Sequence, residues 1–322
     1  MTATFADMIN EVSMNLSGYT LIQDRATYIK SDVANTASTI AAPITLSLAS
    51  SDNLGKGVVE INEELFWVDN YDRVNNTATI SPYGRGYLGT TRAAHTAGDK
   101  VTISPVFPRF AVKRAINDTI SAIGSSIFAA DTTTITYSTA VSAYRLPSGT
   151  ATTLDIRNIL SVAYQSIGPS KEWIPIKKWR FDGNANPTAF TSEQTISIYD
   201  GITSGRTIQI VYSKDPTPFT STINATYTTL ALINDQEFTN ITGLPMSCKD
   251  LVVLGATYRL LSNLDPARAS MVSPQADETD SKRPYGSSQS ITRQIFTLFT
   301  QRLNEEIRNQ QDRYPIRIHY SV

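Results

Sequence analysis

The chain has 322 residues and a formal net charge of −1, and its 18% of charged residues is below the quarter or so usual for globular proteins. Proteins that grip nucleic acid usually carry a basic excess, so we expect no tight, sequence-specific binding of nucleic acid. The single cysteine, Cys248, excludes an internal disulfide and a thiolate metal cluster. The sequence shows neither a signal-peptide pattern nor the roughly 18 apolar residues of a membrane span. We therefore expect a soluble protein made in a reducing cytoplasm.

The first predicted helix has apolar residues at helical spacing from Phe5 to Leu16, and Gly18 is a natural stop. A β-rich block follows, from about residue 40 to residue 104, in which polar turns separate short β-branched runs. Its expected strands are Ile44–Leu48, Val58–Ile61, Leu65–Val68, Thr77–Ser81 and Lys100–Ile103. Short strands at this spacing predict a small sandwich or barrel.

A second helix is predicted after Pro108, where an apolar stripe runs from Val112 to Ile127. A second β-rich block spans residues 131–216 and has a sandwich-like pattern. Its expected strands are Thr134–Tyr137, Leu160–Gln165, Ile174–Trp179, Thr195–Tyr199 and Thr207–Tyr212. Two prolines close to the end of this block predict a stiff linker, which we assign to residues 217–243.

A third helix is predicted from near Pro245, where Ser247 and Asp250 fit a capping box, and Pro266 closes it. The fourth and longest helix runs from about Ser290 to Tyr314. It carries a strict i, i+4 stripe of Ile291, Ile295, Phe299, Leu303 and Ile307. Pro315 ends this helix, and residues 315–322 alternate as an extended C-terminal tail.

These elements predict an α+β fold in which a small bundle of about four helices carries two β-rich insertions. The helical core is assigned to residues 1–30, 105–130 and 244–314, and the insertions to residues 40–104 and 131–216. Each helix has a single apolar face, so each must bury that face against another helix.

Groups that could support catalysis are sparse. The two histidines, His95 and His319, belong to no zinc-binding motif, and the chain has neither a phosphate-binding loop nor a nucleophile elbow. Cys248 lies in the first turn of a predicted helix, and a buried core residue is the favoured interpretation of it. We therefore expect no enzymatic activity, no cofactor and no metal site.

Charged residues in the first β block could suggest a site, but each has a structural interpretation. Neighbours in a strand point to opposite faces, so Glu63 and Glu64 are better explained as the polar turn of a hairpin than as a catalytic pair. The segment around Arg85 resembles a phosphate-binding loop only superficially, because it does not open onto a helix. Arg85, Arg92 and Lys100 add a little positive charge, for which surface charge is the default explanation.

Several longer segments carry a resemblance to a known family. They are VVEINEELFWVDNYDR from residue 58, ATISPYGRGYLGTTRAAHTAGDKVTISP from residue 78, FPRFAVKRAINDTISAIG from residue 107, GLPMSCKDLVVLGATYRLLSNLDPARAS from residue 243 and RLNEEIRNQQDRYPIRIHYSV from residue 302. Together they resemble the head-to-tail connector, or adaptor, proteins of tailed bacteriophages across most of the chain. The first β block is an elaboration that minimal adaptors lack.

The resemblance implies a structural virion protein in the neck between capsid and tail, made in the bacterial host. Its partners would be other copies in a ring of about twelve, the portal protein above and a neck or tail protein below. Double-stranded DNA would pass through the lumen without sequence-specific binding. The residues that would dock on the portal are Arg302, Ile307, Arg308, Arg313, Tyr314, Ile316, Ile318 and Tyr320. Those that would contact the lumen or a neighbouring subunit are Arg85, Arg92 and Lys100.

Two other functions remain open. The glycine-rich segment also occurs in tail and baseplate proteins, so the chain could be a tail-tube adaptor or a fibre-attachment subunit that assembles in threes or sixes. Alternatively, Trp67, Trp173 and Trp179 could form the platform of a carbohydrate- or receptor-binding module, although core positions are the simpler explanation for them.

Overall fold

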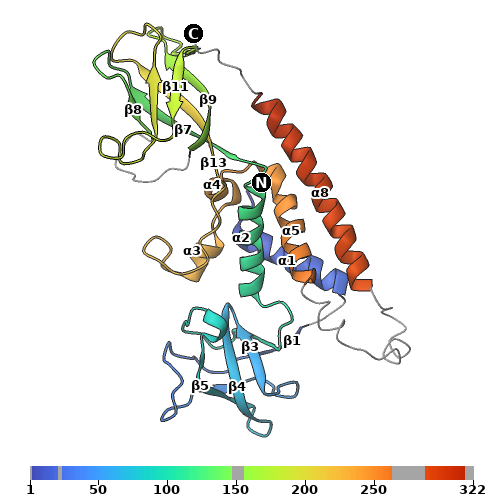
Figure 1. Cartoon of the computed structure of the whole chain (residues 1–322). Helices are drawn as coiled ribbons and strands as arrows, with labels where there is room; N and C mark the ends of the chain where they lie inside the picture. Colours follow the sequence, from blue (N-terminus) through green and yellow to red (C-terminus); the bar gives the residue numbers. More distant parts are fainter. Residues whose placement is uncertain (1, 21–23, 147–155, 263–286, 316–322) are drawn as a thin grey trace.

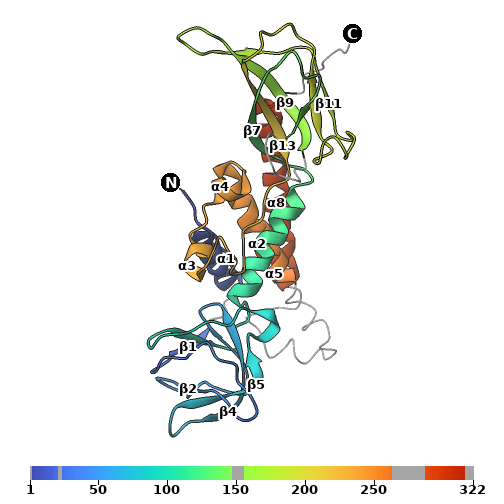
Figure 2. The same cartoon turned by 90° about the vertical axis from the view of Figure 1, so that its left-hand side faces the viewer.

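The computed structural model describes residues 2–20, 24–146, 156–262 and 287–315. A helical region lies in the middle of the molecule, with one β-rich region at each end (Figure 1 and Figure 2). The first β-rich region lies between α1 and α2 in the chain, and the second follows α2. This arrangement confirms the predicted α+β class.

The longer helices are α1 (Phe5–Thr20), α2 (Arg109–Ile123), α5 (Lys249–Ser262) and α8 (Ser287–Arg313). Helix α5 packs against the other three, and their apolar stripes meet in one buried cluster that includes Ile9, Ile116 and Leu251. Gly18 lies inside α1 and does not end it. At the centre, Gly255 of α5 lets α2 and α8 pack closely against α5, because a Cβ there would lie 2.4 Å from Thr119 of α2 and 2.9 Å from Phe299 of α8.

Residues 217–243, predicted as a linker, carry two short helices, α3 (Leu230–Asn234) and α4 (Phe238–Thr242). This segment buries Phe219 and Phe238 in the helical cluster, and the ring centroids of Phe219 and Phe5 stack 4.3 Å apart. The described residues thus hold six α-helices rather than about four, together with two short 3-10 turns, η1 (Tyr87–Gly89) and η2 (Met246–Cys248).

The first β-rich region is a closed barrel. Its strands are β1 (Arg25–Tyr28), β2 (Thr45–Ser47), β3 (Gly57–Ile61), β4 (Glu64–Asp72), β5 (Thr77–Arg85) and β6 (Lys100–Ile103), in the order β1-β6-β3-β4-β5-β2. The two outer strands meet through a bridge between Ile29 and Leu48, which leaves no long open edge among the described strands. Strand β1 precedes the predicted start of this region at residue 40, and the other five strands match the predicted ones.

The second β-rich region is a sandwich of two sheets. Its strands are β7 (Ala129–Thr136), β8 (Tyr144–Arg145), β9 (Ile156–Gln165), β10 (Trp173–Pro175), β11 (Trp179–Asp182), β12 (Thr195–Ile198) and β13 (Thr207–Lys214). The sheets, β10-β9-β13-β7 and β11-β12-β8, enclose one apolar cluster. The single strand predicted over residues 174–179 is wrong, since the chain changes sheets there. The N–H groups of Lys177 and Lys178 donate to the Asp200 carboxylate at this bend.

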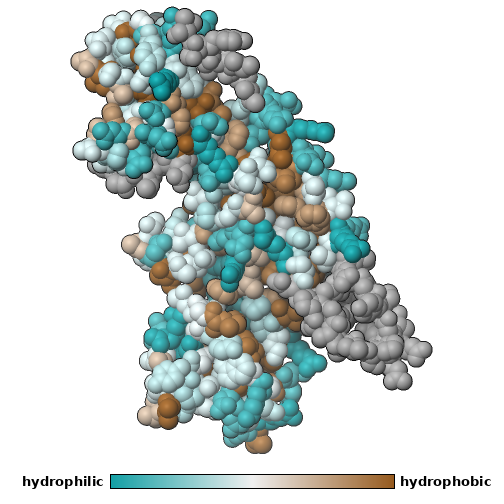
Figure 3. All heavy atoms as spheres, viewed as in Figure 1, coloured by the Kyte–Doolittle hydropathy of each residue, from teal (hydrophilic) through white to brown (hydrophobic). Residues whose placement is uncertain are grey.

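The helices, the barrel and the sandwich each have a separate buried cluster. The surface seen in Figure 3 is largely polar, with apolar side chains gathered beside α8. Within the described ranges, no helix combines the length and the apolar character that crossing a membrane requires.

Candidate functional site

A charged cluster lies inside the barrel. Arg85 donates two hydrogen bonds to the Glu64 carboxylate, from Nε to Oε1 at 2.9 Å and from Nη2 to Oε2 at 2.7 Å. The Nε2 atom of His95 lies 2.9 Å from the same Oε2, and all three side chains are 1% exposed. Glu63 and Glu64 do point to different sides, as predicted. The prediction of a polar hairpin turn is confirmed for Glu63, which lies between β3 and β4. It is wrong for Glu64, which is the first residue of β4 and whose carboxylate is the centre of this buried cluster.

The backbone around the cluster supplies its remaining partners. The Arg85 guanidinium donates to the carbonyls of Ala34, Thr36 and Ala93. Burial alone would raise the pKa of Glu64, but hydrogen bonds from His95, Arg85 and the Ala93 N–H outweigh it and hold that pKa below its usual range. The glycine-rich segment is therefore a structural turn, as predicted from the sequence.

The three residues predicted to contact the lumen or a neighbouring subunit differ in their exposure. The prediction is wrong for Arg85, because its side chain is buried and fully engaged inside the barrel. Arg92 is exposed and its Nε donates to Asn35 at 2.9 Å. Lys100 is exposed at the start of β6. Only Arg92 and Lys100 of this set remain available to a partner.

Helix α8 carries the described part of the predicted portal-docking set. Arg302 bonds within the protein, to Glu305, Glu306 and the Ser247 carbonyl, and Ile307 packs on the helical cluster. Arg308 and Arg313 are exposed, and the half-buried Tyr314 ring lies 5.7 Å from that of Phe128. The predicted docking residues Ile316, Ile318 and Tyr320 lie outside the described residues.

Polar contacts fix α8 to η2, the turn that leads into α5. The Ser247 hydroxyl donates to Oε2 of Glu306 at 2.9 Å, so it serves this contact rather than the predicted capping box. The Sγ atom of Cys248 lies 3.7 Å from the same oxygen, and burial raises the pKa of this thiol to about 12. Cys248 is buried, which confirms the interpretation as a core residue.

A second set of contacts joins α8 to the sandwich. The side chain of Gln310 accepts from the Phe128 N–H at 3.1 Å and donates to the Phe128 carbonyl at 2.6 Å. Phe128 directly precedes β7, so the C-terminal end of α8 is held against the base of the sandwich. Exposed Arg308 and Arg313 therefore lie on a fixed helix end.

Two carboxylates of the barrel join it to α2. Oε1 of Glu60 accepts the N–H of Arg109, the first residue of α2, at 2.7 Å, where the helix dipole favours a carboxylate. Lys113, one turn further on, donates to Oε2 of Glu63 at 2.5 Å. Burial raises the pKa of Glu60 to about 7. Burial also lowers the pKa of Lys113, although Glu63 opposes that shift.

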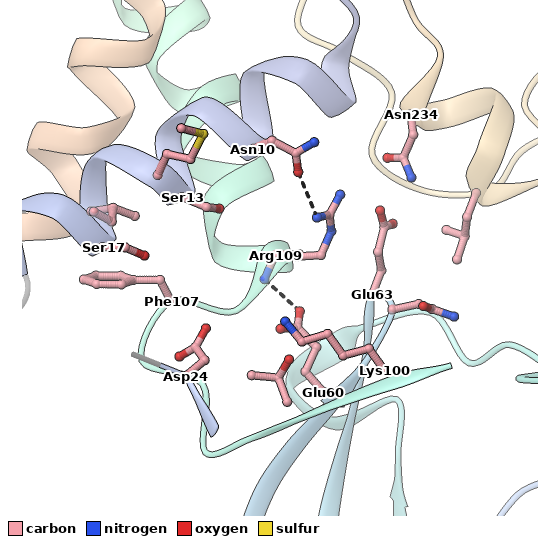
Figure 4. A pocket seen from close by; sticks show the side chains of 15 residues that line it. Asn10, Ser13, Ser17, Asp24, Glu60, Glu63, Lys100, Phe107, Arg109 and Asn234 are labelled. Atoms are coloured by element: carbon pink, nitrogen blue, oxygen red, sulfur yellow. Dashed lines mark hydrogen bonds between the residues drawn. The ribbon is translucent and has the colours of Figure 1, made fainter. Parts of the chain in front are cut away.

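A pocket of about 800 Å³ opens above this contact, between α1, the barrel and the end of α3 (Figure 4). Polar side chains from all these elements line it, including Asn10, Asp24, Glu60, Glu63, Lys100, Arg109 and Asn234. Two of their oxygens, Oε1 of Glu63 and Oδ1 of Asn234, are buried and have no hydrogen-bond partner among the described residues. We call this the junction pocket.

Neither Glu60 nor Lys113 was predicted from the sequence to belong to a site. The available signal for Glu60 was a glutamate inside the otherwise apolar run of residues 58–61. Lys113 directly follows Val112 of the apolar stripe, and its near-complete burial depends on Glu63, fifty residues earlier. A contact at that separation leaves no local pattern.

The three tryptophans do not form one surface. Trp67 is in β4 of the barrel, whereas Trp173 and Trp179 are in β10 and β11 of the sandwich, at the other end of the molecule (Figure 1). A sugar platform built from all three is therefore excluded by the fold.

Comparison with protein families gives a match to the model described as SU10 adaptor protein, over residues 90–318. The match covers more than two thirds of the chain and includes α2, the sandwich, α5 and α8. It leaves out α1 and strands β1 to β5 of the barrel. Comparison with curated proteins gives no match. The extent of the family match shows that the chain belongs to the SU10 adaptor protein family of phage structural proteins.

Proposed function

We propose that this protein is a head-to-tail adaptor, which forms a ring of about twelve copies beneath the portal protein and joins the capsid to the tail. The observation that carries the proposal is membership of the adaptor family across residues 90–318. The role is structural rather than catalytic, and its place is the neck of the virion.

The shape of the subunit supports this role. Two β-rich regions lie at opposite ends of the helical region, so one subunit presents separate surfaces to different neighbours (Figure 2). A heterologous contact repeated by rotation closes into a ring. In such a ring the sandwich and the barrel would meet neighbouring subunits and the next neck or tail protein.

The charge of the chain suits a ring through which DNA passes. With 28 basic and 29 acidic residues, the chain has no large basic excess with which to hold phosphates. We therefore propose that double-stranded DNA moves through the lumen without sequence-specific contacts. Arg92 and Lys100 are the remaining candidates from the predicted set for the lumen or a subunit interface.

The portal would dock on the end of α8 and the tail that follows it. Deletion of residues 315–322 should leave the thermal unfolding of the protein unchanged, because the chain keeps Gln310 and Tyr314, which bind α8 to Phe128. The same deletion should abolish portal binding, measured by co-sedimentation with the cognate portal. Charge reversal of Arg308 and Arg313 should weaken binding in the full-length chain. Undiminished binding by the truncated protein would refute the docking site.

The decisive experiment for the proposed function is the solution mass of the protein alone and mixed with the cognate portal, followed by negative-stain imaging. Rings of about twelve subunits, alone or only on the portal, are the expected result. A trimer or hexamer would instead favour a tail component. A monomer that never joins the portal would refute the adaptor proposal and favour a receptor-binding module.

A further inference from the structure

Two bulky residues on the outside of the barrel have a strained backbone. Tyr83 and Leu88 have φ values of 61° and 55°, in the left-handed region that favours glycine. Both side chains nevertheless project into solvent, with exposed fractions of 75% and 66%. Burial within the subunit therefore does not offset the strain. Strained residues of this kind concentrate at functional sites, where the direction of a side chain must be fixed.

A bulge in β5 sets the position of Tyr83. Residues 81–84 of β5 stand opposite a single residue of β4, Trp67, so the pairing of the two strands is interrupted there. Gly84 lies so close to β4 that a Cβ there would be 3.0 Å from the Trp67 carbonyl oxygen. The Tyr83 N–H donates to the Ser38 carbonyl at 2.7 Å. The backbone that carries the exposed Tyr83 ring is therefore held on both sides.

The 3-10 turn η1 places Leu88 beside the same residue of β4. The Thr90 hydroxyl fixes this turn, because it donates to the Tyr87 carbonyl at 3.0 Å and accepts the Leu65 N–H at 3.0 Å. The Tyr87 ring lies 5.2 Å from the ring of Trp67, which is 37% exposed. The bulge and the turn thus flank Trp67. We call Trp67, Tyr83, Tyr87 and Leu88 the barrel patch.

The barrel patch has the composition of a protein interface. Tyrosine and tryptophan are enriched at the centres of such interfaces, whereas most charged residues are depleted there. Within residues 81–91 the only charged residue is Arg85, and its side chain is buried. A surface that binds DNA would instead need exposed cations for the phosphates. The patch therefore fits an uncharged protein surface.

The patch lies on the flank of the barrel and not at its far end. The turn before β4 faces the helices, because Glu63 there bonds to Lys113 of α2. The turn at residues 73–76, after β4, forms the opposite end, and Trp67 lies between the two turns. A rotation about a ring axis keeps equivalent parts of all copies at the same height. The flank of one barrel in a ring therefore faces the barrels of the adjacent copies.

We propose that the barrel patch binds the barrel of the adjacent copy, on the opposite flank around Tyr28. This inference rests on the ring of the proposed function, in which each contact joins two different surfaces. In the closed barrel β1 lies three strands from β4 in either direction, so the outer faces of these two strands point in opposite directions. Tyr28 of β1 is 54% exposed. The patch precedes residue 90, where the family match begins, so this contact is an addition to the adaptor core.

Two substitutions separate binding from folding. Tyr83→Gly and Leu88→Gly each remove a projecting side chain together with its strain. We expect the thermal unfolding temperature, measured at concentrations too low for rings, to stay unchanged or to rise. The concentration at which half of the chains are in rings, alone or on the portal, should rise at least about tenfold. Val74→Gly is the matched control, because Val74 is 89% exposed in the turn at the far end of the barrel, and it should form rings normally.

The possible results distinguish this contact from the ring itself. If the unmodified protein forms rings and both patch variants form them equally well, the contact is refuted and the ring stands. If the unmodified protein forms no ring even on the portal, the proposed function fails and this inference fails with it. Variants that form normal rings but no longer bind the downstream tail protein would make that protein the occupant and overturn the proposal. A markedly lower unfolding temperature of both variants would assign the two residues a structural role and overturn it as well.

Cross-linking tests the opposite flank directly. A chain that carries both Tyr28→Cys and Leu88→Cys should give a ladder of covalent oligomers with a short bismaleimide, whereas either single variant should not. The native Cys248 is buried, and the pKa of its thiol is raised to about 12, so it should not react. Rings of the double variant that give no cross-linked ladder would overturn the assignment of the Tyr28 flank.

Discussion

At the scale of single residues, Glu60 shows how burial links ionisation to stability. Its pKa rises from 4.5 to about 7 because burial disfavours the charged form more than the Arg109 N–H favours it. The folded protein therefore holds this proton where the unfolded chain has already released it. The stabilisation that this proton gives the folded state is fully present below about pH 4.5 and is lost as pH rises toward about 7.

Replacing Glu60 with Gln removes this titration and keeps an oxygen that can accept the Arg109 N–H. We expect Glu60→Gln to be more stable than the unmodified protein at pH 8, by up to about 3 kcal/mol, and to differ little from it at pH 4.5. Urea unfolding at several pH values measures the difference, in which the titration of all other groups cancels. A constant difference between pH 4.5 and pH 8 would contradict the assigned pKa.

In contrast to Glu60, Glu64 is stabilised in its charged form, by Arg85 and His95. Glu64→Gln should destabilise the barrel by roughly 3–5 kcal/mol, since it leaves the buried Arg85 guanidinium without its counter-charge. The exposed pair of Arg114 and Asp118 offers a control, and Asp118→Asn should change stability by less than about 1 kcal/mol. Chemical unfolding followed by tryptophan fluorescence reports the barrel when Trp173 and Trp179 of the sandwich are replaced by Phe in every chain compared, which leaves Trp67. Equal effects of the two substitutions would refute the structural role of Glu64.

At the scale of elements, the two glycines in the middle of α5 and near the end of α1 make a matched pair. Alanine is favoured over glycine in a helix by about 1 kcal/mol. Gly18→Ala should therefore stabilise, because its new Cβ meets nothing within 4 Å. Gly255→Ala should destabilise by about 1–3 kcal/mol, because its Cβ would meet Thr119 of α2 at 2.4 Å. Thermal unfolding of both variants tests this, and stabilisation by both would show that the α2 contact can relax.

The elements that could be predicted are those whose apolar residues recur at a regular helical or strand spacing. The apolar stripe from Ile291 to Ile307 predicted α8, and β-branched runs predicted β3 and β6 to within a residue. Strands β4 and β5 were predicted at the right place, but each extends four residues beyond its predicted end. The missed elements are short: β1 has four residues, β8 has two, and α3 and α4 have five each. Segments of two to five residues are too short to show a helical or strand periodicity. These elements form because tertiary contacts fix them.

The parts of the candidate site that could not be predicted depend on long-range contacts. Glu63 meets Lys113, Arg85 meets Glu64, and Gln310 meets Phe128 across 182 residues. Apart from Phe128, each of these residues looks in the sequence like an ordinary charged or polar surface residue. Only the closed barrel turns Arg85 inward, which is why a residue predicted to contact a partner is buried.

At the scale of the whole molecule, the barrel is an insertion with adjacent ends. Arg25 at the start of β1 pairs with Ile103 at the end of β6, so the chain enters and leaves the barrel side by side. The barrel and the helices share no buried apolar residue among those described, and the family match begins at residue 90, after five of the six barrel strands. The barrel is therefore separable from the adaptor core in packing.

We expect a chain in which residues 25–103 are replaced by a short Gly/Ser linker, together with Lys113→Met, to fold and to keep the portal binding proposed above. The substitution is needed because Lys113 is buried and would lose Glu63, and an unpaired buried charge is strongly destabilising. The N–H of Arg109 would lose Glu60 but gain water. Circular dichroism, cooperative unfolding and solution mass with the portal test this expectation. The shortened chain with Lys113 unchanged is the control, and it should unfold at a lower temperature. If the shortened chain with the Lys113→Met substitution fails to fold, the barrel is part of the adaptor core; if it folds but cannot join the portal, the barrel supplies an assembly contact.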